Sequence, residues 1–170
     1  MSNITLAEAV KLKSILRKRI AELNDEMDRV AFTIIVDKDK PEEPTRTLEQ
    51  VEQELADVRK DVRTLDRLMY EANSYHTINF EGEALKLVEA IEYATQLRAQ
   101  ADKYKTLAAY DKRSIEYYSE DAPVYRIALY DPETYRLKAI ECERHAHKIS
   151  NAVNAKNYQI ELEFDGDLYF

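Results

Sequence analysis

The chain has 170 residues, of which 45% are hydrophobic and 34% are charged, and its formal net charge is −8 at pH 7. This acidic balance excludes a broad interface with duplex nucleic acid and argues against attraction to anionic lipid. The single cysteine, Cys142, excludes an intrachain disulfide and a zinc site built from cysteines, as expected for a protein of the reducing cytoplasm.

The N-terminal segment lacks the basic stretch and apolar run that are typical of a signal peptide. No segment approaches the ~20 consecutive apolar residues that a helix needs to span a bilayer. We therefore expect a cytoplasmic protein with no membrane partner.

Apolar residues recur at steps of three and four along most of the chain, and only two glycines occur, so we predict a single, mainly α-helical domain over residues 1–170. The four expected helices cover residues 5–29, 47–73, 83–109 and 132–157. Two capping boxes and one Asp-Pro pair predict three of the helix starts. They are Thr5 with Glu8, Thr47 with Gln50, and Asp131 with Pro132.

The second predicted helix carries the clearest apolar stripe, which has the spacing of a coiled-coil seam. Its members are Leu48, Val51, Leu55, Val58, Val62, Leu65, Met69 and Ala72. For the third helix we expect an apolar surface made of Leu87, Val88, Ile91, Ala94, Ala101, Tyr104 and Ala108. These stripes predict long antiparallel helical hairpins in a coiled-coil-like four-helix arrangement, which would assemble into a homo-oligomer. The alternative is a closed monomeric bundle.

Four segments are rich in β-branched and aromatic residues, and these segments predict strands. They cover residues 32–36, 114–118, 124–129 and 158–164. The middle two flank a turn-prone stretch and predict a β-hairpin. The last should add a strand to that hairpin or to another subunit.

Several motifs resemble an uncharacterised bacterial and phage protein family that is often labelled "septicolysin". They are residues 6–10, 18–20, 65–73 and 110–115, together with the Asn157–Tyr158 pair, so that the likeness extends from Leu6 to Leu162. The resemblance implies two long helical pairs with a small hairpin in a bacterium or a phage-infected bacterium. The label implies a cytolysin, which this acidic chain without a secretion signal does not support. The segment from Tyr117 to Pro132 is longer than is usual for the family.

The residues matched to the family lie at or just beyond predicted helix ends, so one end of the bundle would gather them into a ligand-binding pocket. They are Asn73, Tyr110, Arg113, Ser114, Asn157 and Tyr158. Aromatic rings stack on bases, arginine binds phosphate in bidentate fashion, and asparagine reads amide or amino edges, so a small nucleotide-like anion would suit the pocket. In the alternative interpretation the asparagines cap helices, Arg113 pairs with a carboxylate and the tyrosines only pack.

We therefore expect a non-enzymatic protein without cofactors, of the kind a phage would use as a sponge for a nucleotide-derived immune signal. The alternative is a structural or adaptor coiled coil that acts through protein–protein contacts. Two Glu/His pairs, Glu141 with His145 and Glu143 with His147, have a spacing that suits one metal ion, but no further ligands are identifiable. Cys142 lies on an apolar stripe, where a thiol is more often inert than nucleophilic.

Overall fold

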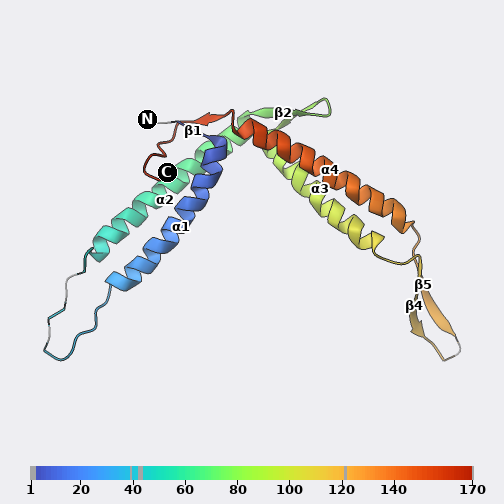
Figure 1. The fold of residues 1–170 in the computed structure, drawn as a ribbon, viewed down its shortest axis with the longest axis horizontal. Helices are drawn as coiled ribbons and strands as arrows, with labels where there is room; N and C mark the ends of the chain where they lie inside the picture. Colours follow the sequence, from blue (N-terminus) through green and yellow to red (C-terminus); the bar gives the residue numbers. More distant parts are fainter. Residues whose placement is uncertain (1–2, 39, 42–43, 121, 170) are drawn as a thin grey trace. The chain divides into compact units, whose positions relative to one another are not determined.

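The computed structural model describes residues 3–38, 40–41, 44–120 and 122–169. These residues form a mainly helical structure with small antiparallel strand pairs (Figure 1). The helices are α1 (Leu6–Val30), α2 (Leu48–Tyr75), α3 (Leu87–Ala108) and α4 (Pro132–Asn157). The strands are β1 (Ile4–Thr5), β2 (Thr77–Phe80), β3 (Glu83–Lys86), β4 (Arg113–Tyr118), β5 (Pro123–Ile127) and β6 (Glu161–Leu162).

The chain divides into two compact units, and the single domain over residues 1–170 stays a prediction. Unit 1 contains Met1–Tyr75 and Lys156–Phe170, and unit 2 contains His76–Ala155. The coiled-coil packing of all four helices stays a prediction.

Within unit 1, α1 and α2 lie side by side and run in opposite directions (Figure 1). Lys13 of α1 pairs with Asp66 of α2, whereas Arg19, further along α1, pairs with Glu54, nearer the start of α2. The apolar sides of both helices are buried and form the core of the unit. The buried residues are Leu6, Ala9, Leu12, Leu16 and Leu23 of α1, and Val51, Leu55, Val58, Leu65 and Ala72 of α2. Five of the eight residues of the predicted α2 stripe are thus buried.

The segments near the two chain ends pair with each other in unit 1. β1 and β6 are antiparallel, with Ile4 opposite Leu162, and the Leu6 N–H donates to the carbonyl of Ile160 over 2.8 Å. The predicted strand over residues 158–164 therefore shrinks to β6, and its partner is β1 rather than the predicted hairpin or another subunit. Buried and exposed side chains still alternate along this segment as the sequence predicts, because Ile160, Leu162 and Phe164 are all buried.

Unit 2 begins with the β2–β3 hairpin, where the sequence predicts no strand and places the start of the third helix at residue 83. Its two turn residues, Glu81 and Gly82, have φ of 52° and 88°, as a two-residue turn of type I′ requires. Glycine meets this requirement without strain, whereas Glu81 adopts it as a non-glycine residue. The hairpin leads directly into α3, where the side chain of Glu89 accepts a hydrogen bond from the Lys86 N–H over 2.8 Å.

α3 and α4 also lie side by side (Figure 1), and their contacting stripes are rich in alanine. The buried residues are Leu87, Ala90, Ala94, Leu97 and Ala101 of α3, and Ala139, Ala146, Ile149 and Val153 of α4. Small side chains allow two helices to approach closely. Val88 and Ile91, which we expected to be buried with this stripe, are about half exposed. Ala90 and Leu97 take their place, since they continue the helical face that carries Ala94 and Ala101.

The predicted strand over residues 32–36 is wrong for the single chain, because this segment lies in the loop after α1 without a strand partner. Its β-branched and aromatic residues favour extended backbone, but a strand needs a neighbour to accept its hydrogen bonds. No described strand of the chain supplies one.

Candidate functional site

The six residues predicted to bind a ligand fall into two groups rather than one. Tyr110, Arg113 and Ser114 follow α3, close to the start of α4, because the Lys112 ammonium donates to the carbonyl of Tyr130 over 2.7 Å. Asn157 ends α4, and a helix of 26 residues is ~39 Å long at 1.5 Å per residue. The helix thus separates the first group from Asn157.

The β4–β5 hairpin determines how the first group is displayed. Its ladder places Arg113 opposite Ile127, Ser114 opposite Arg126, and Ile115 opposite Tyr125. Because neighbouring residues of a strand point to opposite faces, Arg113 and Ser114 do not belong to the same site. Arg113 shares its face with Ile115, Tyr125 and Ile127, which we call the platform face.

On the platform face, the guanidinium of Arg113 lies over the ring of Tyr125, with 3.8 Å between its carbon Cζ and the ring centroid. Arg113 forms no ion pair with any carboxylate among the described residues, contrary to the alternative interpretation. Arg126, on the other face, pairs with the carboxylate of Glu116 over 2.5 Å. The two arginines of one hairpin therefore differ: Arg126 is neutralised by a carboxylate, and Arg113 is held flat by an aromatic ring.

Tyrosine side chains connect the end of β5 to the two helices of unit 2. The Tyr130 hydroxyl donates to the carbonyl of Leu107 at the end of α3 over 2.8 Å. The ring of Tyr135, on α4, packs edge-on against Tyr130 at 5.1 Å and against Tyr104 of α3 at 5.3 Å between centroids. These contacts position the strand that begins at Arg113, and such edge-on pairs are worth about 0.5–1.5 kcal/mol beyond their buried area.

The sequence analysis missed Tyr125, which makes the only ring contact that the structure gives for Arg113 among the described residues. The predicted strands, over residues 114–118 and 124–129, left Arg113 outside the hairpin and fixed no register. The observed pairing of Arg113 with Ile127 puts Tyr125 diagonally across from Arg113 on the same face. Tyr110 lies just after the end of α3 and is 48% exposed, so its ring is available to a ligand.

The second group lies in unit 1. Asn73 is half-buried near the end of α2, and Tyr158 is exposed just after α4. The carboxamide oxygen of Asn157 is buried and has no hydrogen-bond partner among the described residues. Asn157 thus keeps hydrogen-bonding capacity at the end of α4, but it does not share a site with Arg113.

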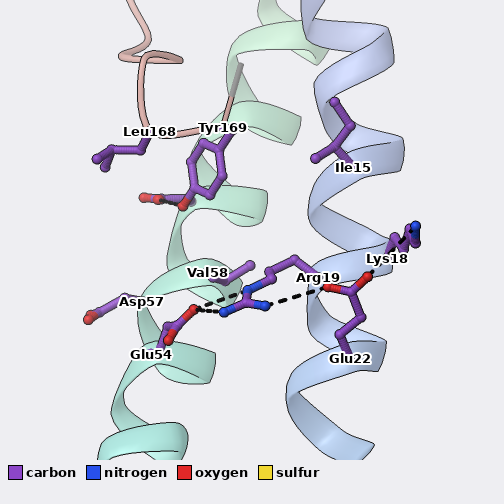
Figure 2. A pocket seen from close by; sticks show the side chains of 10 residues that line it. Ile15, Lys18, Arg19, Glu22, Glu54, Asp57, Val58, Leu168 and Tyr169 are labelled. Atoms are coloured by element: carbon purple, nitrogen blue, oxygen red, sulfur yellow. Dashed lines mark hydrogen bonds and ion pairs between the residues drawn. The ribbon is translucent and has the colours of Figure 1, made fainter. Parts of the chain in front are cut away.

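A groove of about 710 Å³ lies in unit 1, where residues of α1, α2 and the C-terminal tail line it (Figure 2). Both of its cations, Lys18 and Arg19, already pair with carboxylates of the same groove. Arg19 binds Glu54 at 2.5 Å and Glu22 at 3.5 Å, and Lys18 lies 3.7 Å from Glu22. The hydrogen bonds to Arg19, led by that to Glu54, raise its pKa, and the pKa of Glu54 is correspondingly lowered. We interpret this groove as part of the packing of the helix pair, because both cations of its lining are held by carboxylates.

The two Glu/His pairs of α4 behave differently from each other. The Nε2 atom of His145 lies 3.0 Å from Glu141 and 3.5 Å from Glu81. Glu143 pairs with Lys105 of α3 instead of with His147. No group of three metal-ligating side chains occurs in the part of the chain that the structure describes.

The remaining chemical candidate is the thiol of Cys142 on α4. Burial, with a smaller contribution from Glu141, raises its pKa, which lowers the fraction of reactive thiolate at neutral pH. The thiol lies 3.7 Å from the side-chain oxygen of Gln100. This environment is that of a packing residue.

Within the described residues, no helix combines the length and the apolar character needed to cross a bilayer. Comparison with models of protein families gives no match, and comparison with curated proteins gives none either. Among solved structures, the chain resembles a "functionally unknown conserved protein" from Corynebacterium diphtheriae, with a TM-score of 0.70 and 21% sequence identity. The match covers 95% of this chain and 100% of that one, and at this identity it shows a shared fold and no function.

Proposed function

We propose that this protein is a non-enzymatic, oligomeric binding protein that holds a nucleotide-derived anion on its platform face and thereby sequesters it. The observation that carries the proposal is the position of Arg113 over Tyr125, 3.8 Å from the ring centroid and without a carboxylate partner among the described residues. The other predicted contacts, Asn73, Ser114, Asn157 and Tyr158, are not needed for it.

The stacked arginine suits such an anion for two reasons. Stacking uses the flat face of the guanidinium and leaves the N–H groups along its edge to form paired hydrogen bonds with phosphate oxygens. The ring also limits the motion of the side chain before the ligand arrives, which reduces the entropy lost on binding. The nearby ring of Tyr110 offers a surface on which a base can stack.

The overall charge of −8 does not oppose this proposal. At physiological ionic strength, interactions between exposed charges more than about 8 Å apart are largely screened. The carboxylate within the hairpin ladder, Glu116, is on the other face and is bound by Arg126. Among the described ladder residues, Arg113 is thus the only charged side chain on the platform face.

A calorimetric titration of the full chain with cyclic nucleotides and cyclic ADP-ribose isomers tests the proposal. We expect one or more members of this panel to bind the natural chain, and we expect Arg113→Ala to abolish the heat of binding. The matched control is Arg126→Ala, which removes the same side chain from the other face of the same hairpin and should bind like the natural chain. Arg113→Lys keeps the positive charge but lacks the planar guanidinium, so its affinity for the ligand should lie between those of the natural chain and Arg113→Ala.

Two results would contradict the proposal: an absence of heat across the panel, or equal affinity of Arg113→Ala and the natural chain. A thermal-shift screen of the same panel serves as a first measurement, because a ligand at a hundred times its dissociation constant stabilises the native state by about 2.7 kcal/mol.

A second candidate function, that of an adaptor acting through protein–protein contacts, is favoured by a different observation. Phe32, Ile34 and Val36 are 84%, 98% and 75% exposed, which is unusual for neighbouring apolar residues. A flat response to the nucleotide panel, together with capture of a defined protein partner that Ile34→Lys prevents, would favour the adaptor.

A further inference from the structure

We infer that the segment Phe32–Val36 of one copy adds as a strand to the edge of the β4–β5 hairpin of a second copy. This interface deepens the proposed function, because it identifies the surfaces of the proposed oligomer and extends the platform face with residues of a second copy.

The segment Phe32–Val36 combines strong strand preference with almost complete exposure. Three alternating side chains, Phe32, Ile34 and Val36, are 84%, 98% and 75% exposed, and Ile35 is 46% exposed. No backbone hydrogen bond joins residues 32–35 to another described residue. Natural sequences seldom leave local preference and observed structure in such conflict, unless a partner resolves the conflict.

The β4–β5 hairpin supplies a matching acceptor. It has only two strands, so both outer edges present unpaired backbone groups, and an isolated two-stranded hairpin is marginally stable in water. β5 has five residues and the segment Phe32–Val36 also has five. The other strand pairs of the described chain are shorter, with two residues per strand in β1–β6 and four in β2–β3. The β4–β5 hairpin is therefore the acceptor whose length fits.

The side chains match as well as the lengths. Ile115, Tyr125 and Ile127 of the platform face are 49%, 40% and 57% exposed, although all three are apolar or aromatic. In an added strand, Phe32, Ile34 and Val36 share one face because they alternate. Placed beside the platform face, they form a continuous apolar surface of cross-strand neighbours.

A second copy is the occupant that satisfies both surfaces at once. Each chain carries one unpaired segment and one open hairpin, so pairing between copies uses the same two surfaces of every chain. A strand from an unrelated protein would cover the hairpin but leave the segment Phe32–Val36 exposed. The incoming residues would extend the platform face, so that residues of two chains contribute to the surface that carries Arg113 and Tyr125.

The test is the mass of the full chain in solution, measured without nucleotide by sedimentation equilibrium. One variant, Ile34→Lys, places a charge in the segment, and the other, Ile127→Lys, places a charge on the platform face of the hairpin. The matched controls add the same charge at Thr33, on the other side of the segment, and at Leu129, beyond the end of β5. All four positions are exposed or lie in short surface elements, and circular dichroism confirms that the helices of each variant are retained.

We expect the natural chain and both controls to associate, and each of the two variants to be monomeric. An equimolar mixture of Ile34→Lys and Ile127→Lys should regain association, because the intact segment of one variant meets the intact hairpin of the other. A monomeric natural chain would overturn the inference, and so would a mixture that stays monomeric. Association of Ile127→Lys alone would show that the segment pairs with itself, and association of Ile34→Lys alone would show that the segment is not needed.

These outcomes differ from those that test the ligand. A monomer that binds nucleotide through Arg113 would overturn this interface and leave the binding site standing. An oligomer that depends on Ile34 and Ile127 but binds no member of the nucleotide panel would support this interface and overturn the binding site.

Discussion

The phenol of Tyr169 donates a hydrogen bond to the carboxylate of Asp61, with 2.5 Å between Oη and Oδ2. The bond joins the C-terminal tail to α2 across 108 residues of sequence, beside the groove of unit 1 (Figure 2). Burial raises the pKa of Tyr169 well above its ordinary value, and the hydrogen bond to Asp61 adds to this effect. The tail is thus anchored by one polar contact whose strength depends on the phenol keeping its proton.

We predict that Tyr169→Phe weakens this anchor. A hydrogen bond of this kind contributes about 1 kcal/mol to stability, and its loss should show as a lower urea midpoint and as faster amide exchange in residues 165–169. Tyr158→Phe, at an exposed tyrosine, is the control and should leave both quantities unchanged. Equal exchange rates in Tyr169→Phe and the natural chain would show that other contacts hold the tail.

The same contact has a defined dependence on pH. Because the folded state raises the pKa of Tyr169, the contribution is fully present below the unfolded tyrosine pKa of about 10 and is lost as the pH rises above it. The stability difference between the natural chain and Tyr169→Phe should therefore be constant from pH 7 to pH 9 and shrink above pH 10. A difference that grows with alkaline pH would contradict this sign.

At the start of α1, the capping box formed by Thr5 and Glu8 predicts an acid-sensitive contribution. The Thr5 N–H donates to the Glu8 carboxylate over 2.7 Å, and this bond, followed by that from the Thr5 hydroxyl, lowers the pKa of Glu8. Stability from Glu8 is therefore present above the unfolded glutamate pKa of about 4.3 and is lost as the pH falls through the lower folded value.

Urea unfolding of the natural chain and Glu8→Gln measures this effect. Glu8→Gln should be the less stable of the two at pH 7, and the difference should disappear near pH 2. Glu49→Gln, at an exposed acidic residue in the first turn of α2, serves as the comparison. If the difference in the free energy of unfolding between the natural chain and Glu8→Gln did not change at acid pH, the charge of the carboxylate would have no role in the cap.

The alanine stripe between α3 and α4 predicts a strong response to added volume. Ala94 is 3% exposed, so a larger side chain there must push the two helices apart or adopt a strained rotamer. We expect Ala94→Leu to destabilise unit 2 by about 1–3 kcal/mol, whereas Thr95→Leu, one residue further on the exposed side, should change stability little. The midpoints of thermal unfolding of the two variants are compared. An unchanged midpoint for Ala94→Leu would show that the space between α3 and α4 accommodates a leucine side chain.

Much of the fold could be predicted from the sequence, because helix starts depend on local chemistry. The capping boxes of Thr5 and Thr47 and the N-cap of Asp131 all form as expected, and the helices begin within one residue of the predicted positions at these three sites. Local alternation also predicted the β4–β5 hairpin. The start of α3 was misplaced, because the β2–β3 hairpin has only four residues per strand and carries little periodic signal.

The candidate site was harder to predict, because it depends on where whole elements lie. The sequence-based prediction gathered residues from several helix ends at one end of the bundle. Asn157, however, ends α4, about 39 Å from the residue at which that helix begins. The prediction also grouped Arg113 with Ser114 as neighbours in sequence, although strand geometry turns them to opposite faces. The contact of Arg113 with Tyr125 follows from the register of the hairpin, which local patterns leave undetermined.

The most direct measurement of the central claim, that a nucleotide-like anion binds at Arg113 and Tyr125, uses the variant Tyr125→Trp. The chain has no tryptophan, so the new indole is a single reporter, and its ring can still support the guanidinium of Arg113. A nucleotide that binds in calorimetry should quench this fluorescence with a saturable curve at the same dissociation constant, and adding Arg113→Ala should remove the quenching. Calorimetric binding without any change in the fluorescence of Trp at this position would contradict the claim.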